Sequence, residues 1–509
     1  MKEYLKSLKP LESAADVAYT LQGNGFFEQM RKVAQNKGEC LLKNEQTYNV
    51  LNYGAVADGK TLNSAAVQRA VDECSKNGGG VVYFPRGSFV LSTVFLKDNV
   101  TVFLDEKAVI LGSLNYYDYC PDEQVDYPLY QDVSHSFFHS SMFVGEDVRN
   151  VAIMGKGKID MRSVWDEDGI RGKEIKNRGA KCIALKNSAN IQISGLEIVN
   201  VTDLAVYFAG CDNVEVFGLT LRVYIDGISP DNSKNVKIYD CDVEAGDDGI
   251  VFKSSYTLNR LGECENIDVR NCRLKSRCNA IKFGTETNGG FKNITIEDIF
   301  IKETRMCGIA IESVDGAVLD GVKIRNVQMK NVNVPLFVHL GKRMRGPKGR
   351  KIGEIKNVLI ENVVADGPYE PYEIVAWNYD SYKKGDFYQY PWKFGKAESF
   401  DDSAEERTAE SSWQMTCNVC GLQGYPLRNI TIRNMKLRLD GGVHIYDKQV
   451  PENAQDYPEV YVYGRVLPAK GIYFRHIDGL VLENVQVETY KPDAREDFVF
   501  SNVDNLKID

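Results

Sequence analysis

Short runs of alternating apolar and polar residues recur through the middle of the chain, and each run opens with an asparagine. In the recurring phrase, Asn is followed by an apolar, a variable and a second apolar residue. It begins at Asn190, Asn213, Asn235, Asn266, Asn293, Asn357 and Asn429. Alternation with a period of two is typical of strands that bury one face. The first five copies lie 22 to 31 residues apart, so the pattern predicts a repeat built from short strands.

A single repeat of this length cannot bury its apolar face alone, whereas stacked repeats can. The Leu-x-x-Leu-x-Leu frame of leucine-rich repeats is missing, and a β-sandwich would need a hairpin turn at each junction rather than the return of one phrase. We therefore expect an all-β fold, a right-handed parallel β-helix.

The segments around this solenoid have different patterns. Residues 1–46 are predicted to be an amphipathic helical appendage, and residues 47–509 the β-helix domain. Residues 62–76 predict a short helix that covers the open end of the coils, with Asn63 or Ser64 as N-cap and a stop at Gly78. Residues 378–426 and 441–468 interrupt the repeat, and we expect them to be surface loops.

Composition narrows the classes of partner. The net charge of −9 argues against a general nucleic-acid binder, which would normally carry a basic surface. No apolar run is long enough for a membrane span, and the first residues lack the apolar core of a secretory signal. We expect a cytoplasmic protein that binds neither nucleic acid nor membrane, and the oligomeric state stays open.

Three carboxylates stand out against the repeat. Asp226 precedes a glycine, and Asp247 and Asp248 lie between two glycines, 21 residues further on. That separation is close to one coil, and residues one coil apart lie about 4.8 Å apart. We therefore expect the three to gather on one face. Crowded carboxylates can keep one group protonated while another is ionised, which is the pair that glycoside hydrolysis needs.

The residues resemble glycoside hydrolase family 28, the polygalacturonases and rhamnogalacturonan-degrading enzymes, over roughly residues 46–509. The likeness rests on residues 48–59, on the stretch from Asp226 to Ser254, and on residues 457–460 with 467–471. It implies an inverting mechanism, with Asp247 as general acid and with Asp226 and Asp248 activating water. It implies an oligosaccharide or polysaccharide substrate of the pectin type, and Lys253 beside the substrate. We expect cleavage at chain ends.

The chain departs from the family pattern at three blocks. Tyr224-Ile225-Asp226 stands for Asn-Thr-Asp, Arg277-Cys278-Asn279 for Gly-His-Gly, and Ala310-Ile311-Glu312 for Arg-Ile-Lys. The last change removes two cations that would hold a galacturonate carboxylate. The sugar at the cleaved bond could therefore be rhamnose or neutral, or Arg277 and Lys282 could replace the lost cations. The further candidates for substrate binding are Asn279, Glu312 and His339.

Other signals are weaker. No metal site and no cofactor are expected, because the five histidines have no ligand spacing and Cys417-x-x-Cys420 has no second pair. Two alternative functions remain open. A polysaccharide lyase or epimerase would use Arg277 and Lys282 on the same scaffold. A non-catalytic carbohydrate-binding solenoid would have little reason to crowd three carboxylates.

Overall fold

The computed structural model describes residues 21–164, 179–369, 374–375, 391–392, 414–443, 446, 449–464 and 466–509. These residues form two compact units. The first comprises residues 21–245 and 255–273, and the second comprises residues 246–254 and the described part of 274–509. Residues 1–20 of the predicted appendage, and residues 376–390 and 393–413 around the first predicted insertion, lie outside the described residues.

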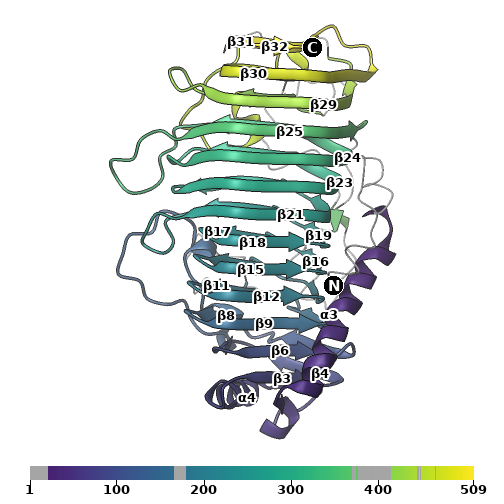
Figure 1. The fold of residues 1–509 in the computed structure, drawn as a ribbon, viewed down its shortest axis with the longest axis vertical. Coiled ribbons are helices and arrows are strands. Elements are labelled where there is room, and N and C mark those ends of the chain that lie inside the picture. The colour runs from purple at the N-terminus through teal and green to yellow at the C-terminus, as the bar shows by residue number, and fades with distance from the viewer. Residues whose placement is uncertain are drawn as a thin grey trace. The chain divides into compact units, whose positions relative to one another are not determined.

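Three parallel sheets build the first unit (Figure 1). The first sheet contains β1 (Thr47–Asn49), β3 (Gly80–Phe84), β6 (Val100–Leu104), β9 (Arg149–Gly155), β12 (Ala189–Ser194), β15 (Asp212–Phe217), β18 (Lys234–Tyr239) and β21 (Glu263–Ser276). The second contains β2 (Asp58–Leu62), β4 (Gly87–Leu91), β7 (Ala108–Gly112), β10 (Lys158–Asp160), β13 (Glu197–Val199), β16 (Thr220–Val223) and β19 (Asp242–Ala245). The third contains β5 (Val94–Phe95), β8 (Ser141–Glu146), β11 (Lys181–Lys186), β14 (Val206–Ala209) and β17 (Ile228–Asp231).

The second unit continues the same construction with longer strands. Its parallel ladders contain β20 (Ile250–Ser254), β22 (Ile281–Thr287), β23 (Gly290–Ser313), β24 (Val318–Leu340), β25 (Glu354–Asp366), β28 (Cys417–Cys420), β29 (Leu427–Gly441), β30 (Ala469–Lys491), β31 (Glu496–Asp504) and β32 (Lys507–Ile508). A separate antiparallel pair joins β26 (Ile374–Val375) to β27 (Pro391–Trp392). Each unit is a stack of parallel coils, so the predicted β-helix is confirmed.

The recurrent asparagines explain how the coils turn. All seven asparagines of the repeated phrase have a positive φ, a left-handed conformation that asparagine tolerates better than most residues. In the first unit their amides also stack along the coils. The Nδ2 atoms of Asn150, Asn190 and Asn213 each donate to Oδ1 of an asparagine one coil earlier, over 2.8–2.9 Å. The second unit has its own ladder, through Asn326, Asn362, Asn434 and Asn484.

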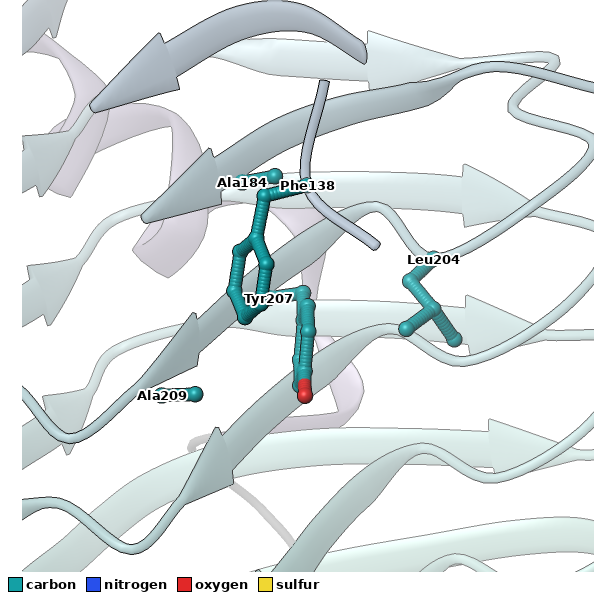
Figure 2. Close-up of a cluster of buried hydrophobic side chains, with 5 residues drawn as sticks. All are labelled: Phe138, Ala184, Leu204, Tyr207 and Ala209. Carbon is teal, nitrogen blue, oxygen red and sulfur yellow. The ribbon is translucent and has the colours of Figure 1, made fainter. Parts of the chain in front are cut away.

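Aromatic and aliphatic side chains from neighbouring coils fill the first unit and also fix a long loop. Figure 2 shows one such cluster, made by Phe138, Ala184, Leu204, Tyr207 and Ala209. The rings of Phe138 and Tyr207 stack with centroids 5.1 Å apart. The Tyr207 hydroxyl lies 2.9 Å from the carbonyl oxygen of His135. Packing of the coil thereby holds the irregular segment that carries His135.

The helix α3 (Asn24–Asn44) lies against the first unit (Figure 1). The Arg31 guanidinium donates to the carbonyl oxygens of Gly195, at 2.9 Å, and Lys156, at 2.8 Å. Ala34 packs on the stacked rings of Phe217 and Tyr239. Neither α3 nor the shorter α4, the two α-helices in the described chain, has the length and apolarity to cross a membrane.

The helix α4 (Ser64–Lys76) confirms the second predicted helix, with Asn63 at its N-cap position. The Asn63 side chain makes no capping hydrogen bond. Its amide instead bonds Val56, accepting from the backbone nitrogen over 2.7 Å and donating to the carbonyl oxygen over 3.0 Å. Asn63 therefore holds the loop before the helix. The described 3-10 turns are η1 (Val50–Tyr53), η2 (Tyr116–Asp118), η3 (Val133–His135) and η6 (Val460–Tyr463).

The end of the first predicted insertion belongs to the coils. Within residues 378–426, the strand β28 pairs in parallel with both β24 and β30. The two cysteines of the C-x-x-C pattern, Cys417 and Cys420, lie in this strand as buried free thiols. Burial raises the pKa of each thiol to about 12. They are packing residues, as their isolation in the sequence indicated.

Candidate active site

Strand register gives Asp226 and Asp248 equivalent positions. In the first unit β16 pairs with β19, and Val223 lies opposite Ala245. Asp226 follows Val223 by three residues, and Asp248 follows Ala245 by three. Asp226 precedes the buried strand β17, and Asp248 precedes the buried strand β20. Each carboxylate therefore has the same position in the chain relative to the strands before and after it.

Asp226 lies beside a histidine that the sequence did not single out. Its carboxylate is 3% exposed, and Oδ2 lies 3.7 Å from Nε2 of His135. The other ring nitrogen, Nδ1, lies 2.7 Å from Oδ1 of Asp132. The imidazole is thus held between two carboxylates. His135 escaped prediction because its loop is outside the repeat, and no spacing relates it to Asp226.

Asn279 holds Asp248. Its backbone nitrogen and its Nδ2 both donate to Oδ1 of Asp248, over 3.2 Å and 2.9 Å. Its own Oδ1 accepts from the backbone nitrogen of Cys307 at 3.2 Å. Asn279 is fully buried, and its hydrogen bonds position the Asp248 carboxylate; its predicted contact with substrate stays a prediction. Hydrogen bonds of this kind stabilise the ionised carboxylate.

Lys282 lies at the centre of a buried group of charges. Its Nζ is 2.7 Å from Oε1 of Glu459, and 3.8 Å from carboxylate oxygens of both Asp248 and Glu312. Burial disfavours the ammonium, but the three carboxylates outweigh burial and raise the pKa of Lys282 well above its usual value. Lys282 is therefore a permanent cation whose charge is compensated within the protein.

Glu312 has the opposite behaviour. Its side chain is fully buried, and neither carboxylate oxygen has a hydrogen-bond partner among the described residues. Burial raises the pKa of Glu312 well above its usual value, against the attraction of Lys282. Burial thus disfavours the ionised form of Glu312. Where the family pattern has a cation, this chain has a buried carboxyl group.

Lys253 lies in a second buried ion pair. Its Nζ lies 2.9 Å from Oε2 of Glu286 and donates to the carbonyl oxygen of Gly284 at 3.2 Å. The Arg345 guanidinium pairs with the other oxygen of Glu286. Lys253 is 4% exposed, so this network fixes its ammonium firmly. The sequence placed Lys253 near the site but did not identify Glu286.

The remaining predicted residues have contrasting environments. Asp247 is partly exposed, and its backbone carbonyl accepts from the Ser276 hydroxyl. Arg277 is also partly exposed. His339 is fully buried, with Nδ1 2.5 Å from the Tyr463 hydroxyl, and burial lowers the pKa of its imidazole to about 3. His339 thus lies in the core as a neutral imidazole at pH 7, and its predicted role in substrate binding stays a prediction.

In the second unit, five residues thus form one connected cluster: Asp248, Asn279, Lys282, Glu312 and Glu459. Sequence reasoning missed Glu459, although it lies in residues 457–460, a stretch that carried part of the family likeness. The spacing gave no signal, because 177 residues separate Lys282 from Glu459. Chemically, the cluster presents a fixed carboxylate, Asp248, next to the partly exposed carboxyl group of Asp247.

Comparison with known proteins finds a family model and several relatives. The family model of glycosyl hydrolases family 28 matches residues 122–369, which include all three carboxylates. A probable polygalacturonase of Vitis vinifera is 29% identical over 300 residues, which cover 56% of this chain and 61% of that protein. An exo-poly-alpha-D-galacturonosidase of Dickeya chrysanthemi is 25% identical over 339 residues, 56% of this chain and 55% of that protein. The chain thus spans little more than half the length of these relatives.

The fold has solved counterparts. The structure of a family 28 exopolygalacturonase from Yersinia enterocolitica superposes with a TM-score of 0.63, covering 91% of this chain and 78% of that one. The identity in this alignment is 20%, so the likeness concerns the fold.

Proposed function

Because residues 122–369 match the family model of glycosyl hydrolases family 28, we propose that the chain is a member of this family and that it hydrolyses glycosidic bonds in oligosaccharides or polysaccharides of the pectin type. Asp247 acts as the general acid, and Asp226 and Asp248 act as the bases that activate water. The observation that carries the proposal is the contrast between two adjacent carboxylates. Asp248 is nearly buried and receives two hydrogen bonds from Asn279, whereas Asp247 is partly exposed.

This contrast suits an acid and a base. The Asn279 donors, with the Lys282 ammonium 3.8 Å away, stabilise Asp248 as a carboxylate. Asp247 is exposed enough to exchange its proton with a ligand. Asp226 and Asp248 each follow a paired strand position, Val223 or Ala245, by three residues, which supports the same role for both.

The proposed reaction is a single displacement. A water molecule loses a proton to the bases as its oxygen bonds to the anomeric carbon. The glycosidic carbon–oxygen bond breaks, and the leaving oxygen takes the proton of Asp247. Configuration inverts, since the attack and the departure occur on opposite faces of the sugar. We further propose release of units from chain ends, and the exo-acting relative from Dickeya chrysanthemi supports this.

The test is product analysis with a matched pair of variants. The purified chain is incubated with galacturonan and rhamnogalacturonan fragments, and the products are resolved by mass and chromatography. Asp247→Asn should lower the rate by about 10²- to 10⁴-fold, the usual contribution of a general acid. Asp268→Asn, which removes a partly exposed carboxylate paired with Arg270 on β21, should retain activity.

Each outcome has a meaning. A saturated monosaccharide as the first product supports exo-acting hydrolysis, whereas random mid-chain fragments contradict the chain-end proposal. Unsaturated products that absorb in the ultraviolet would identify a lyase instead. Equal rates for Asp247→Asn and the parent would remove Asp247 from the mechanism, provided that circular dichroism shows both variants folded.

A further inference from the structure

The loop between β24 and β25 (Figure 1) is strongly basic in a chain whose net charge is −9. Residues 341–353 contain no acidic residue. Residues 342–351, which we call the basic loop, carry six cations: Lys342, Arg343, Arg345, Lys348, Arg350 and Lys351. Such a concentration of one sign attracts anions, especially where the cations lack local partners.

Half of these cations anchor the loop. The Arg343 guanidinium binds Asp315, with Nε 3.0 Å from Oδ1, and donates to the carbonyl oxygen of Thr285 at 2.7 Å. Arg345 pairs with Glu286. Arg350 donates to the carbonyl oxygen of Gly316 at 2.9 Å. These contacts fix the backbone of the basic loop against the end of β22.

The charges of the other three cations are not neutralised by a carboxylate within the described residues. Lys342, Lys348 and Lys351 are exposed, and none of them has an ion-pair partner within the described parts of the chain. An exposed lysine alone is ordinary. Here three of them lie on a loop of ten residues that arginine anchors hold in place, so an extended anion could meet several of them at once.

The anchors also connect the basic loop to the candidate active site. Glu286 accepts Arg345 on one oxygen and the Lys253 ammonium on the other. The Arg343 guanidinium lies over the ring of Tyr457, 5.8 Å from its centroid. Tyr457 is 55% exposed and lies two residues before Glu459, the partner of Lys282. An exposed aromatic residue, of the kind that stacks on sugar rings, therefore lies next to Arg343 of the basic loop and two residues from Glu459.

The two groups of cations differ in what they can bind. The carboxyl groups of Asp248, Glu312 and Glu459 surround the buried Lys282 ammonium. A substrate carboxylate placed there would compete with these groups for the cation. The exposed lysines of the basic loop have no such competitor among the described residues. Negative charge on a substrate is thus favoured at the basic loop and gains little at Lys282.

From this contrast we infer that the basic loop is a substrate-binding surface for acidic sugars, separate from the position at which the glycosidic bond is broken. The inference rests on the proposed function and extends it. The substrate is a glycan whose carboxylates contact Lys342, Lys348 and Lys351, while the sugar beside Lys282 needs no carboxylate. Tyr457 stacks on a ring between them.

The test measures binding and hydrolysis separately. The probes are an oligogalacturonate and the same oligosaccharide after its carboxylates have been reduced to alcohols. Binding of each probe is measured by titration calorimetry at low ionic strength. The loop variant is Lys348→Gln/Lys351→Gln. The control variant, Lys323→Gln/Lys330→Gln, makes the same change of charge at two exposed lysines on β24.

We expect the loop variant to bind oligogalacturonate about 3- to 10-fold more weakly, the effect of removing two exposed charge pairs. Its affinity for the reduced probe should not change, and the control variant should match the parent with both probes. Equal affinity of the loop variant and the parent for oligogalacturonate overturns the inference. So does a parent protein that binds the reduced probe as well as the charged one.

The same measurements distinguish a failure of the proposed hydrolysis from a failure of the inference about the basic loop. If the parent hydrolyses pectic substrates but the loop variant binds normally, the hydrolase stands and the basic loop has no such role. If the loop variant loses affinity while the parent releases no product, the basic loop binds acidic glycans and the proposed hydrolysis is wrong.

Discussion

Asp240 and Asp242 lie two residues apart, both buried, yet their carboxyl groups have opposite preferences. Burial would raise the pKa of both. The guanidinium groups of Arg273 and Arg222 reach Asp242, and these cations hold its pKa below the usual value. For Asp240, burial outweighs the nearby Asn271 and Arg270 and raises the pKa to about 7. Hydrogen bonds from the two guanidinium groups distinguish Asp242 from Asp240 and decide the direction of each pKa shift.

Asp240 predicts a pH dependence of stability. Its pKa is about 7 in the folded chain and about 3.9 when unfolded. Between these values the unfolded chain releases the proton while the folded chain keeps it, so this stability is complete below pH 4 and is lost as the pH rises to 7. Asp240→Asn removes the titration. It should raise the free energy of unfolding at pH 8 by a few kcal/mol at most, and change it little at pH 4.

Chemical denaturation at the two pH values measures the effect. Asn also tolerates the positive φ of 58° at this position, so the backbone should be unaffected. An equal change at pH 4 and pH 8 would contradict the role of titration.

At the scale of the element, the asparagine turn is the unit that the chain repeats. It supplies a left-handed residue at a corner, and its amide bonds the equivalent amide of the neighbouring coil. The alternating residues that follow place one face of each strand in the core, as in β15, where Val214 and Val216 are buried and Glu215 is not. The repeated phrase therefore carries both the corner and the strand.

Two substitutions at Asn213 separate the two contributions. Asn213 has a φ of 56°, and its Nδ2 donates to Asn190 over 2.8 Å. Asn213→Gly keeps the backbone conformation and loses the hydrogen bond, which should cost about 0.5–1.5 kcal/mol. Asn213→Ala loses the bond and also strains the backbone, so it should cost about 1–2 kcal/mol more. Thermal unfolding measures both, and equal losses would exclude a contribution from backbone strain.

At the scale of the whole molecule, each coil of a solenoid is stabilised by its contacts with the neighbouring coils. Ile193 on β12 is fully buried and lies opposite Ile153 of β9 and Val216 of β15. Few contacts reach further along a solenoid, so each coil depends on the two beside it. Stability should therefore vary from coil to coil.

Ile193→Ala tests this dependence. It should cost about 2–5 kcal/mol, as truncation of buried aliphatic residues usually does. Hydrogen exchange should accelerate most in β9, β12 and β15, and least in β1 and β3. Gln192→Ala, on the outward side of the same strand, should leave the exchange pattern nearly unchanged. A uniform loss of protection across the first unit would instead show that its coils unfold together.

Local pattern made most of the fold predictable. Period two, recurrent asparagine and a spacing of one coil are features of neighbouring residues, so the β-helix, α4 and the corner positions of Asp226 and Asp248 could be predicted. The capping hydrogen bond of α4 was less predictable, because the Asn63 side chain bonds Val56 of the preceding loop instead. The predicted domain boundaries and loop insertions stay predictions, apart from β28.

The sequence by itself determined the coil and the chemistry available at its corners, because both depend on residues within one repeat. Only the tertiary structure decided the state of the side chains. It buried His339 and Glu312, surrounded Lys282 with Glu459 and two other carboxyl groups, and placed His135 beside Asp226. Burial and charge depend on partners that lie tens to hundreds of residues away, and no local pattern specifies them.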